Sequence, residues 1–164
     1  AIEYARHKAS GKKPALAKPY NDRYKGVGDM TLTNGLKGTK NYADGQWQAY
    51  LGVDLDAVID LGETTPVGRI SSTYFHNPDV WIFMPASVEY AISEDGANFT
   101  VLKVVEPADP METTGPVIEE FAAAFENTSA RFIRVRAKNI GVCPKWHAGA
   151  GGAAFMFADE IVVE

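Results

Sequence analysis

Residues Ser87–Val105 read SVEYAISEDGANFTVLKVV and contain two segments of alternating apolar and polar residues around a turn. In the first segment every second residue from Val88 to Ile92 is apolar, and successive side chains of a β-strand point to opposite faces. The dipeptide Asp95-Gly96 is a strong hairpin signal. Phe99–Val105 supplies the return strand. This stretch therefore predicts an antiparallel β-hairpin.

Further segments rich in β-forming residues are separated by turn residues along the chain. They are Leu55–Leu61, Arg69–Phe75, Arg131–Ala137 and Glu160–Val163. Ile118–Phe125 is compatible with either a strand or a helix. Short strands without intervening helices predict an all-β antiparallel sandwich or barrel. Residues 1–25 lack sustained periodicity and are predicted to be a linker or lead-in from a preceding domain, so that residues 26–164 form the sandwich.

Length and charge exclude several classes of partner. The 164 residues suit one globular domain. Sixteen basic and 21 acidic residues give a net charge of −5, the wrong sign for phosphate contacts, so we expect no nucleic-acid partner. No apolar run approaches the roughly 18 residues that span a bilayer, so we expect no membrane insertion. Ala1–Lys13 lacks the apolar core of a signal peptide.

The motifs of common enzymes are not found in the sequence. A glycosidase needs two carboxylates facing each other across a cleft, whereas the acidic pairs here lie at predicted turns and segment ends. The single cysteine, Cys143, excludes an internal disulfide and a thiolate zinc cluster. Cys143 and His147 share a loop, but no third group is evident to orient them as a nucleophile and base. We predict a non-enzymatic domain with no catalytic residues.

Several stretches, in their order and spacing, carry a resemblance to a known family. They are Leu32–Thr39 (LTNGLKGT), Trp47 followed by Val58–Gly62 (VIDLG), Val88–Phe99 (VEYAISEDGANF) and Ala130–Val135 (ARFIRV). Together they resemble the discoidin, or coagulation factor 5/8 type C, domain, a family that overlaps the family 32 carbohydrate-binding modules. This resemblance implies an antiparallel jelly-roll β-sandwich, similar to galactose-binding domains.

The last part of the chain narrows the resemblance. Ala137–His147 (AKNIGVCPKWH) and Phe157–Ile161 (FADEI) are similar to the version of this domain at the C-terminus of bacterial chitobiase-like β-N-acetylhexosaminidases. The resemblance implies a non-catalytic accessory domain of a glycoside hydrolase, with the catalytic domain in the same polypeptide. It also implies export to the periplasm, the cell surface or the medium. We expect a monomer.

The resemblance also implies a structural calcium ion, bound by a glycine-containing loop and the last strand. The implied ligands are the main-chain carbonyls of Thr31, Leu36 and Asp159, the side chains of Asn34 and Thr39, and the Glu160 carboxylate. Oxygen ligands of this kind suit calcium. Asn34 stands where the family more often has aspartate, which removes one negative charge. The alternative is that Asn34-Gly35 is only a turn and Glu160 a solvated strand end.

Aromatic and planar polar residues in predicted loops are candidates for sugar recognition, because sugars stack on aromatic faces and hydrogen-bond through their hydroxyls. The candidates are Tyr42, His76, Asn77, Trp81, Trp146 and His147. Packing explains the two tryptophans equally well, and both histidines have structural alternatives. Trp47 and Tyr50 are predicted to pack internally.

The predicted function is a carbohydrate-binding domain that holds the parent enzyme on glycans containing N-acetylhexosamine or galactose. The alternative is a structural or protein-interaction domain that packs on the catalytic domain and binds no sugar.

Overall fold

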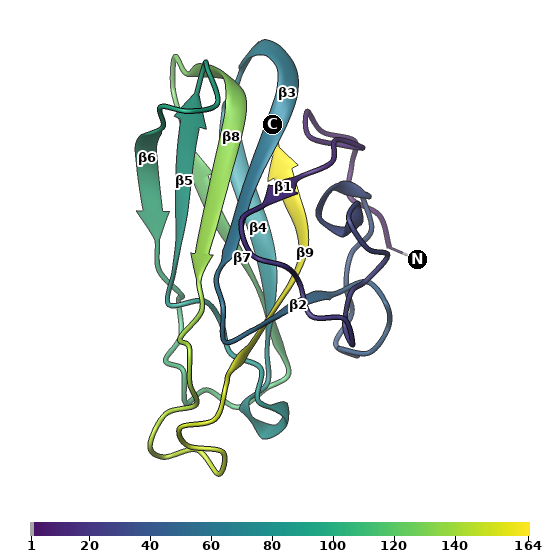
Figure 1. Cartoon of the computed structure of the whole chain (residues 1–164), viewed down its shortest axis with the longest axis vertical. Helices are drawn as coiled ribbons and strands as arrows, with labels where there is room; N and C mark the ends of the chain where they lie inside the picture. The colour runs from purple at the N-terminus through teal and green to yellow at the C-terminus, as the bar shows by residue number, and fades with distance from the viewer. Residues whose placement is uncertain (1) are drawn as a thin grey trace.

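The computed structural model describes residues 2–164 and consists of two antiparallel β-sheets packed face to face (Figure 1). One sheet has the strand order β1-β3-β8-β5-β6 and the other β2-β9-β4-β7. The first sheet contains β1 (Ala15–Leu16), β3 (Leu55–Pro66), β8 (Ser129–Lys138), β5 (Ser87–Ser93) and β6 (Thr100–Val105). The second contains β2 (Gln48–Leu51), β9 (Phe155–Val163), β4 (Arg69–His76) and β7 (Val117–Ala124). This arrangement confirms the predicted all-β jelly-roll sandwich.

Apolar and polar side chains alternate along the strands, so that one face of each sheet lies in the core and the other faces outward. On β8, Ile133 and Val135 are fully buried against the second sheet. The intervening Arg134 points outward, where its guanidinium binds the Asp56 carboxylate of β3 at 2.8 Å and 3.0 Å. The hairpin predicted around Asp95-Gly96 joins β5 and β6, and Gly96 has a φ of 76°, a conformation that favours glycine.

Strand β9 is buried along nearly its whole length, because it is covered on both faces. One face meets the core, and parts of residues 2–46, including those with Tyr4 and His7, cover the other (Figure 1). Ala9 is fully buried, and the Lys8 N–H donates to the Val163 carbonyl at 2.8 Å. Residues 2–25, expected as a linker, therefore pack on the sandwich and contribute β1.

Two short 3-10 helices, η1 (Thr31–Thr33) and η2 (Pro78–Val80), complete the described elements. Trp47 and Tyr50 are buried, as predicted. No helix of the described chain is long and apolar enough to cross a membrane. The loop between β8 and β9 lies beside the η2 turn at one end of the sandwich, the lower end in Figure 1. This end is called the tip below.

Candidate functional site

The η2 turn presents Trp81 at the tip. The Asn77 side chain accepts a hydrogen bond from the Asp79 N–H at 3.2 Å and so caps the turn. The Trp81 N–H donates to the Pro78 carbonyl at 3.0 Å. Trp81 has a φ of 67°, which is uncommon for a residue with a side chain. The turn leaves 40% of Trp81 exposed, so the sequence places a large aromatic ring where solvent and ligands reach it.

The loop before β9 presents Trp146 and His147. Hydrogen bonds between Cys143 and both Gly151 and Gly152 close this loop. Trp146 is 47% exposed. The His147 Nδ1 accepts from the Gly149 N–H at 2.9 Å, so Nε2 carries the proton and donates to the Pro78 carbonyl at 2.6 Å. His147 thus ties this loop to the η2 turn.

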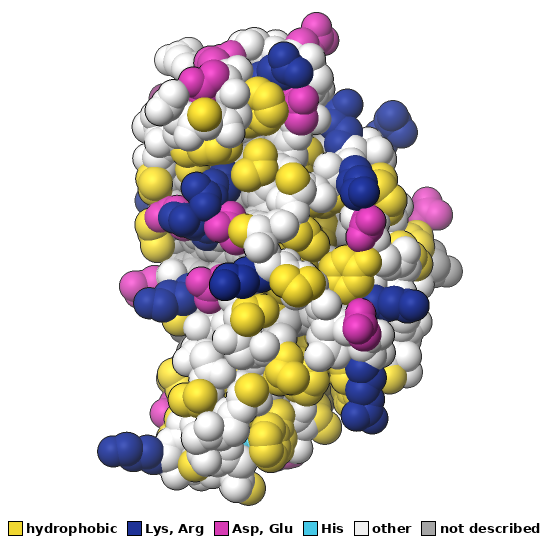
Figure 2. All heavy atoms as spheres, in the orientation of Figure 1, with side chains coloured by type: hydrophobic (Ala, Val, Ile, Leu, Met, Phe, Trp, Pro, Cys, Tyr) yellow, Lys and Arg dark blue, Asp and Glu magenta, His cyan; other side chains and the backbone are white. Residues whose placement is uncertain are grey.

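These two segments enclose a hollow of about 260 Å³ lined by Pro78, Asp79, Trp81, Trp146, His147 and Ala148. The His147 ring lies edge-on to both indoles, with centroids 5.6 Å from Trp81 and 5.8 Å from Trp146. The ring of the buried Phe83 packs against the His147 ring, with a centroid distance of 5.4 Å. In Figure 2 apolar and uncharged groups dominate the lower end of the visible face. The hollow offers exposed aromatic surface beside one carboxylate, that of Asp79.

Trp81 depends on two glycines of the neighbouring loop. A Cβ atom on Gly149 would lie 2.4 Å from the Trp81 ring, and one on Gly152 would lie 2.9 Å from it. Only residues without side chains allow the ring to rest there. The sequence indicated a sharply turning glycine-rich loop, but not this contact. Pro78, Asp79 and Phe83 were also missed, although Asn77-Pro78-Asp79 is a recognisable turn signal.

The structure gives His76 a different environment from the tip tryptophans. It is only 2% exposed, and its Nε2 donates to the Thr113 carbonyl at 2.9 Å while Nδ1 accepts from the Met84 N–H at 3.1 Å. Burial lowers the pKa of His76. Both ring nitrogens are therefore used by the main chain, which corrects the expectation of sugar hydrogen bonds. The ring lines a separate, mainly apolar hollow beside Met84 and Met111.

Two other sequence predictions concern Tyr42 and the pair Cys143 and His147. Tyr42 lies in another hollow, next to Tyr24, at a centroid distance of 5.8 Å. Cys143 is buried, and burial raises the pKa of its thiol. Because both nitrogens of His147 are bonded to main-chain groups, it is not placed to serve as a base for Cys143. The pair thus has a structural role.

Three of the residues expected to bind calcium, Asn34, Thr39 and Glu160, use their side-chain oxygens in hydrogen bonds within the chain. Among residues 2–164 no group of three or more His, Cys, Asp or Glu side chains is arranged to hold a metal ion. The Asn34 amide oxygen accepts from the Leu36 N–H at 2.9 Å. Thr39 Oγ1 donates to the Asp44 carboxylate at 2.7 Å. The side-chain oxygens of Asn34 and Thr39 are thus directed to partners within the chain.

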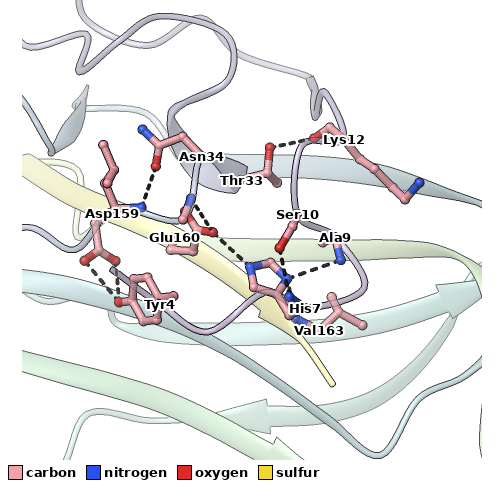
Figure 3. A network of polar contacts seen from close by, with 12 residues as sticks. Tyr4, His7, Ala9, Ser10, Lys12, Thr33, Asn34, Asp159, Glu160 and Val163 are labelled. Carbon is pink, nitrogen blue, oxygen red and sulfur yellow. Dashed lines mark hydrogen bonds and ion pairs between the residues drawn. The ribbon is translucent and has the colours of Figure 1, made fainter. Parts of the chain in front are cut away.

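The two acidic residues of β9 are buried and bind hydrogen-bond donors instead (Figure 3). Asp159 accepts from the Tyr4 hydroxyl at 3.0 Å and from the Gly38 N–H at 2.9 Å. Glu160 accepts from the Gly35 N–H at 3.0 Å and from His7 Nε2 at 2.9 Å. These donors satisfy both carboxylates within the chain. Glu160 is also not the solvated strand end of the alternative interpretation.

Burial sets the protonation of this pair. It raises the pKa of Asp159 to about 7 and also raises the pKa of Glu160. A bound dication would favour the ionised forms and act in the opposite direction. His7 Nδ1 accepts from the Ala9 N–H at 3.2 Å, which leaves the proton on Nε2, facing Glu160. Residues 2–46 thus supply the donors that satisfy the two buried carboxylates of β9.

No protein-family model matches the sequence, and no curated protein matches it. Solved structures do. A chitosan-binding module from a chitosanase/glucanase of Paenibacillus sp. IK-5 is 15% identical with a TM-score of 0.60, and the match covers 98% of this chain and 99% of that one. The fucose binding module SpX-3 of Streptococcus pneumoniae is 11% identical with a TM-score of 0.61, covering 98% of each chain.

A third structure is CpGH89CBM32-5 from Clostridium perfringens, in complex with GalNAc-β-1,3-galactose. It is 16% identical with a TM-score of 0.56, and the match covers 92% of this chain and 93% of that one. Identities this low show the fold alone. The chain has the jelly-roll fold of the discoidin-type, family 32 carbohydrate-binding modules.

Proposed function

We propose that the protein is a carbohydrate-binding domain and that the hollow between Trp81 and Trp146 holds the sugar. The observation that carries this proposal is the exposure of both indoles around one hollow, held in place by His147. A pyranose presents C–H groups to such rings, and its hydroxyls find an acceptor in the Asp79 carboxylate. The structural neighbours named above include modules described with chitosan, fucose and GalNAc-β-1,3-galactose, which supports a glycan as the ligand.

The resemblance of the last segment to chitobiase-like enzymes supports a more specific proposal for the ligand and the parent enzyme. The ligand then contains N-acetylhexosamine or galactose, and the domain belongs to an exported glycoside hydrolase whose catalytic domain lies in the same polypeptide. The domain itself performs no chemistry. It raises the effective concentration of glycan near the active site. Affinity for one sugar is expected to be millimolar to high micromolar, because a shallow hollow offers few contacts.

A glycan array followed by calorimetry tests this function. The panel contains N-acetylglucosamine, galactose, fucose, chitosan oligosaccharides and GalNAc-β-1,3-galactose. Trp81→Ala and Trp146→Ala are each expected to reduce affinity about fivefold or more, since one aromatic stacking contact contributes about 1 kcal/mol or more. Met111→Ala is the matched control. Met111 is as exposed as Trp81 but lines the apolar hollow beside His76.

Two results would contradict the proposal. Absence of binding to every glycan, together with tight association with the parent catalytic domain, would favour the structural alternative. Turnover of a chromogenic hexosaminide by this chain alone would instead make it an enzyme.

A further inference from the structure

A second hollow lies around Tyr42, which the sequence singled out but the tip site does not include. Its volume is about 550 Å³. It is lined by Arg23, Tyr24, Lys25, Gly26, Tyr42, Ala43, Gly45 and Trp47. None of these residues lines the tip hollow. No carboxylate is among them, which is notable in a chain of net charge −5.

The two cations of this hollow are free to bind an anion. Arg69, Arg131, Arg134 and Arg136 each pair with a carboxylate on the sheets. Within residues 2–164, by contrast, neither Arg23 nor Lys25 has a carboxylate within 4.0 Å, and both are exposed. The nearby Asp44 is turned into its own loop, where it accepts from Thr39 and from the Gln46 N–H.

Aromatic rings lie beside these cations. Tyr24 and Tyr42 meet edge to face, and the Arg23 guanidinium lies 5.4 Å from the centroid of the Tyr24 ring. This contact holds the guanidinium beside the hollow. Gly45 has no atom within 4 Å of the position that a Cβ would take, so the wall there is open. A planar guanidinium next to aromatic faces suits a ring that carries a carboxylate.

The hollow is also adjacent to the tip. The Tyr24 ring lies 5.7 Å from the Phe155 ring, and the Phe155 N–H donates to the Trp81 carbonyl at 2.9 Å. We propose that this second hollow binds acidic sugars, in which a uronate carboxylate pairs with Arg23 and Lys25 while the pyranose ring contacts Tyr42. The inference goes beyond the proposed function, because its residues are separate from those of the tip.

Calorimetry with digalacturonic acid, and with its neutral counterpart galactobiose, tests this inference. Arg23→Gln/Lys25→Gln is expected to weaken digalacturonate binding at least tenfold at low salt, and Tyr42→Ala to weaken it severalfold. Lys103→Gln/Lys138→Gln is the matched control, since it removes the same charge from exposed positions on β6 and β8. It is expected to leave binding unchanged. Thermal unfolding of each variant confirms that it folds.

Different outcomes separate this inference from the proposed function. Loss of digalacturonate binding in the Arg23/Lys25 variant, with retention in Trp146→Ala, supports the second hollow. Retention in the Arg23/Lys25 variant, equal affinity for both disaccharides, or no digalacturonate binding at all would each overturn it. None of these results decides whether neutral glycans bind at the tip, because that binding is tested by Trp146→Ala.

Discussion

The position of the Trp81 ring at the tip requires that residue 149 has no side chain. Gly149→Ala would bring a methyl group to within 2.4 Å of the indole and force the ring to move. We expect about a tenfold loss of glycan affinity with little change in the unfolding midpoint, because the ring is partly exposed. Calorimetry and thermal unfolding check this. Gly68→Ala is the control, since its Cβ would meet only ordinary contact distances; equal losses in both variants would refute the role of Gly149.

Asp159 makes stability depend on pH in an unusual direction for an acid. Because its pKa is raised to about 7, the native state holds a proton between about pH 4 and pH 7 that the unfolded chain releases. The free energy of unfolding should therefore fall as pH rises through this window and level off above it. Each pH unit removes about 1.4 kcal/mol at most, so a fall of about 2 to 4 kcal/mol is expected from pH 4 to pH 8.

Urea unfolding at several pH values checks this prediction, with Asp159→Asn as the comparison. The substitution removes the titrating group and should flatten the profile over the same range. A wild-type profile that rises with pH, or an unchanged slope in the variant, would contradict the assignment.

The histidines mark the limit of prediction for single residues. Sequence placed both His76 and His147 in aromatic loops, whereas the structure has His76 at the end of β4 and only His147 in a loop. Their roles depend on the main-chain groups of Thr113, Met84 and Pro78, which approach from other segments. No local pattern encodes these partners, so sequence alone left both the structural and the ligand interpretation open.

At the scale of elements, the N-terminal segment acts as a cover for β9. His7→Ala would leave the buried Glu160 with only the Gly35 N–H as partner. We expect a loss of about 1 to 3 kcal/mol in the free energy of unfolding, which is typical of a buried group that loses its hydrogen-bond partner. Arg6→Ala, an exposed neighbour, is the control and should change little.

The same element predicts the response to calcium. Since Asp159 and Glu160 already bind Tyr4, His7 and two main-chain donors, neither calcium chloride nor a chelator should shift the unfolding temperature of the wild-type chain. A calcium-dependent rise of several degrees would show that the donors give way to a cation and would refute this description of the site.

Strands with clear alternation were predictable and those without it were not. Leu55–Leu61 and Ser87–Ser93 correspond to β3 and β5, because apolar side chains on one face must be buried. The glutamates and alanines of β7 are compatible with a helix as well as a strand. The segment forms a strand because it pairs with β4. β2 pairs with β9 but is only four residues long, which is too short for a pattern to reveal it.

At the scale of the whole molecule, the two sheets form a rigid support and the candidate site lies where loops meet at one end. Sequence indicated the fold and several of the aromatic residues. It did not indicate that the η2 turn and the loop before β9 close around one hollow, because they are far apart in the chain and are joined by contacts such as that of His147 with Pro78.

The indole N–H signals in a ¹H–¹⁵N NMR titration with glycan test the central claim most directly. The chain has three tryptophans; Trp81 and Trp146 line the hollow, whereas Trp47 is buried with its indole N–H bonded to the Thr39 carbonyl. We expect the Trp81 and Trp146 signals to move together with one dissociation constant while the Trp47 signal stays in place. Glycan binding that leaves both exposed indoles unmoved would contradict it.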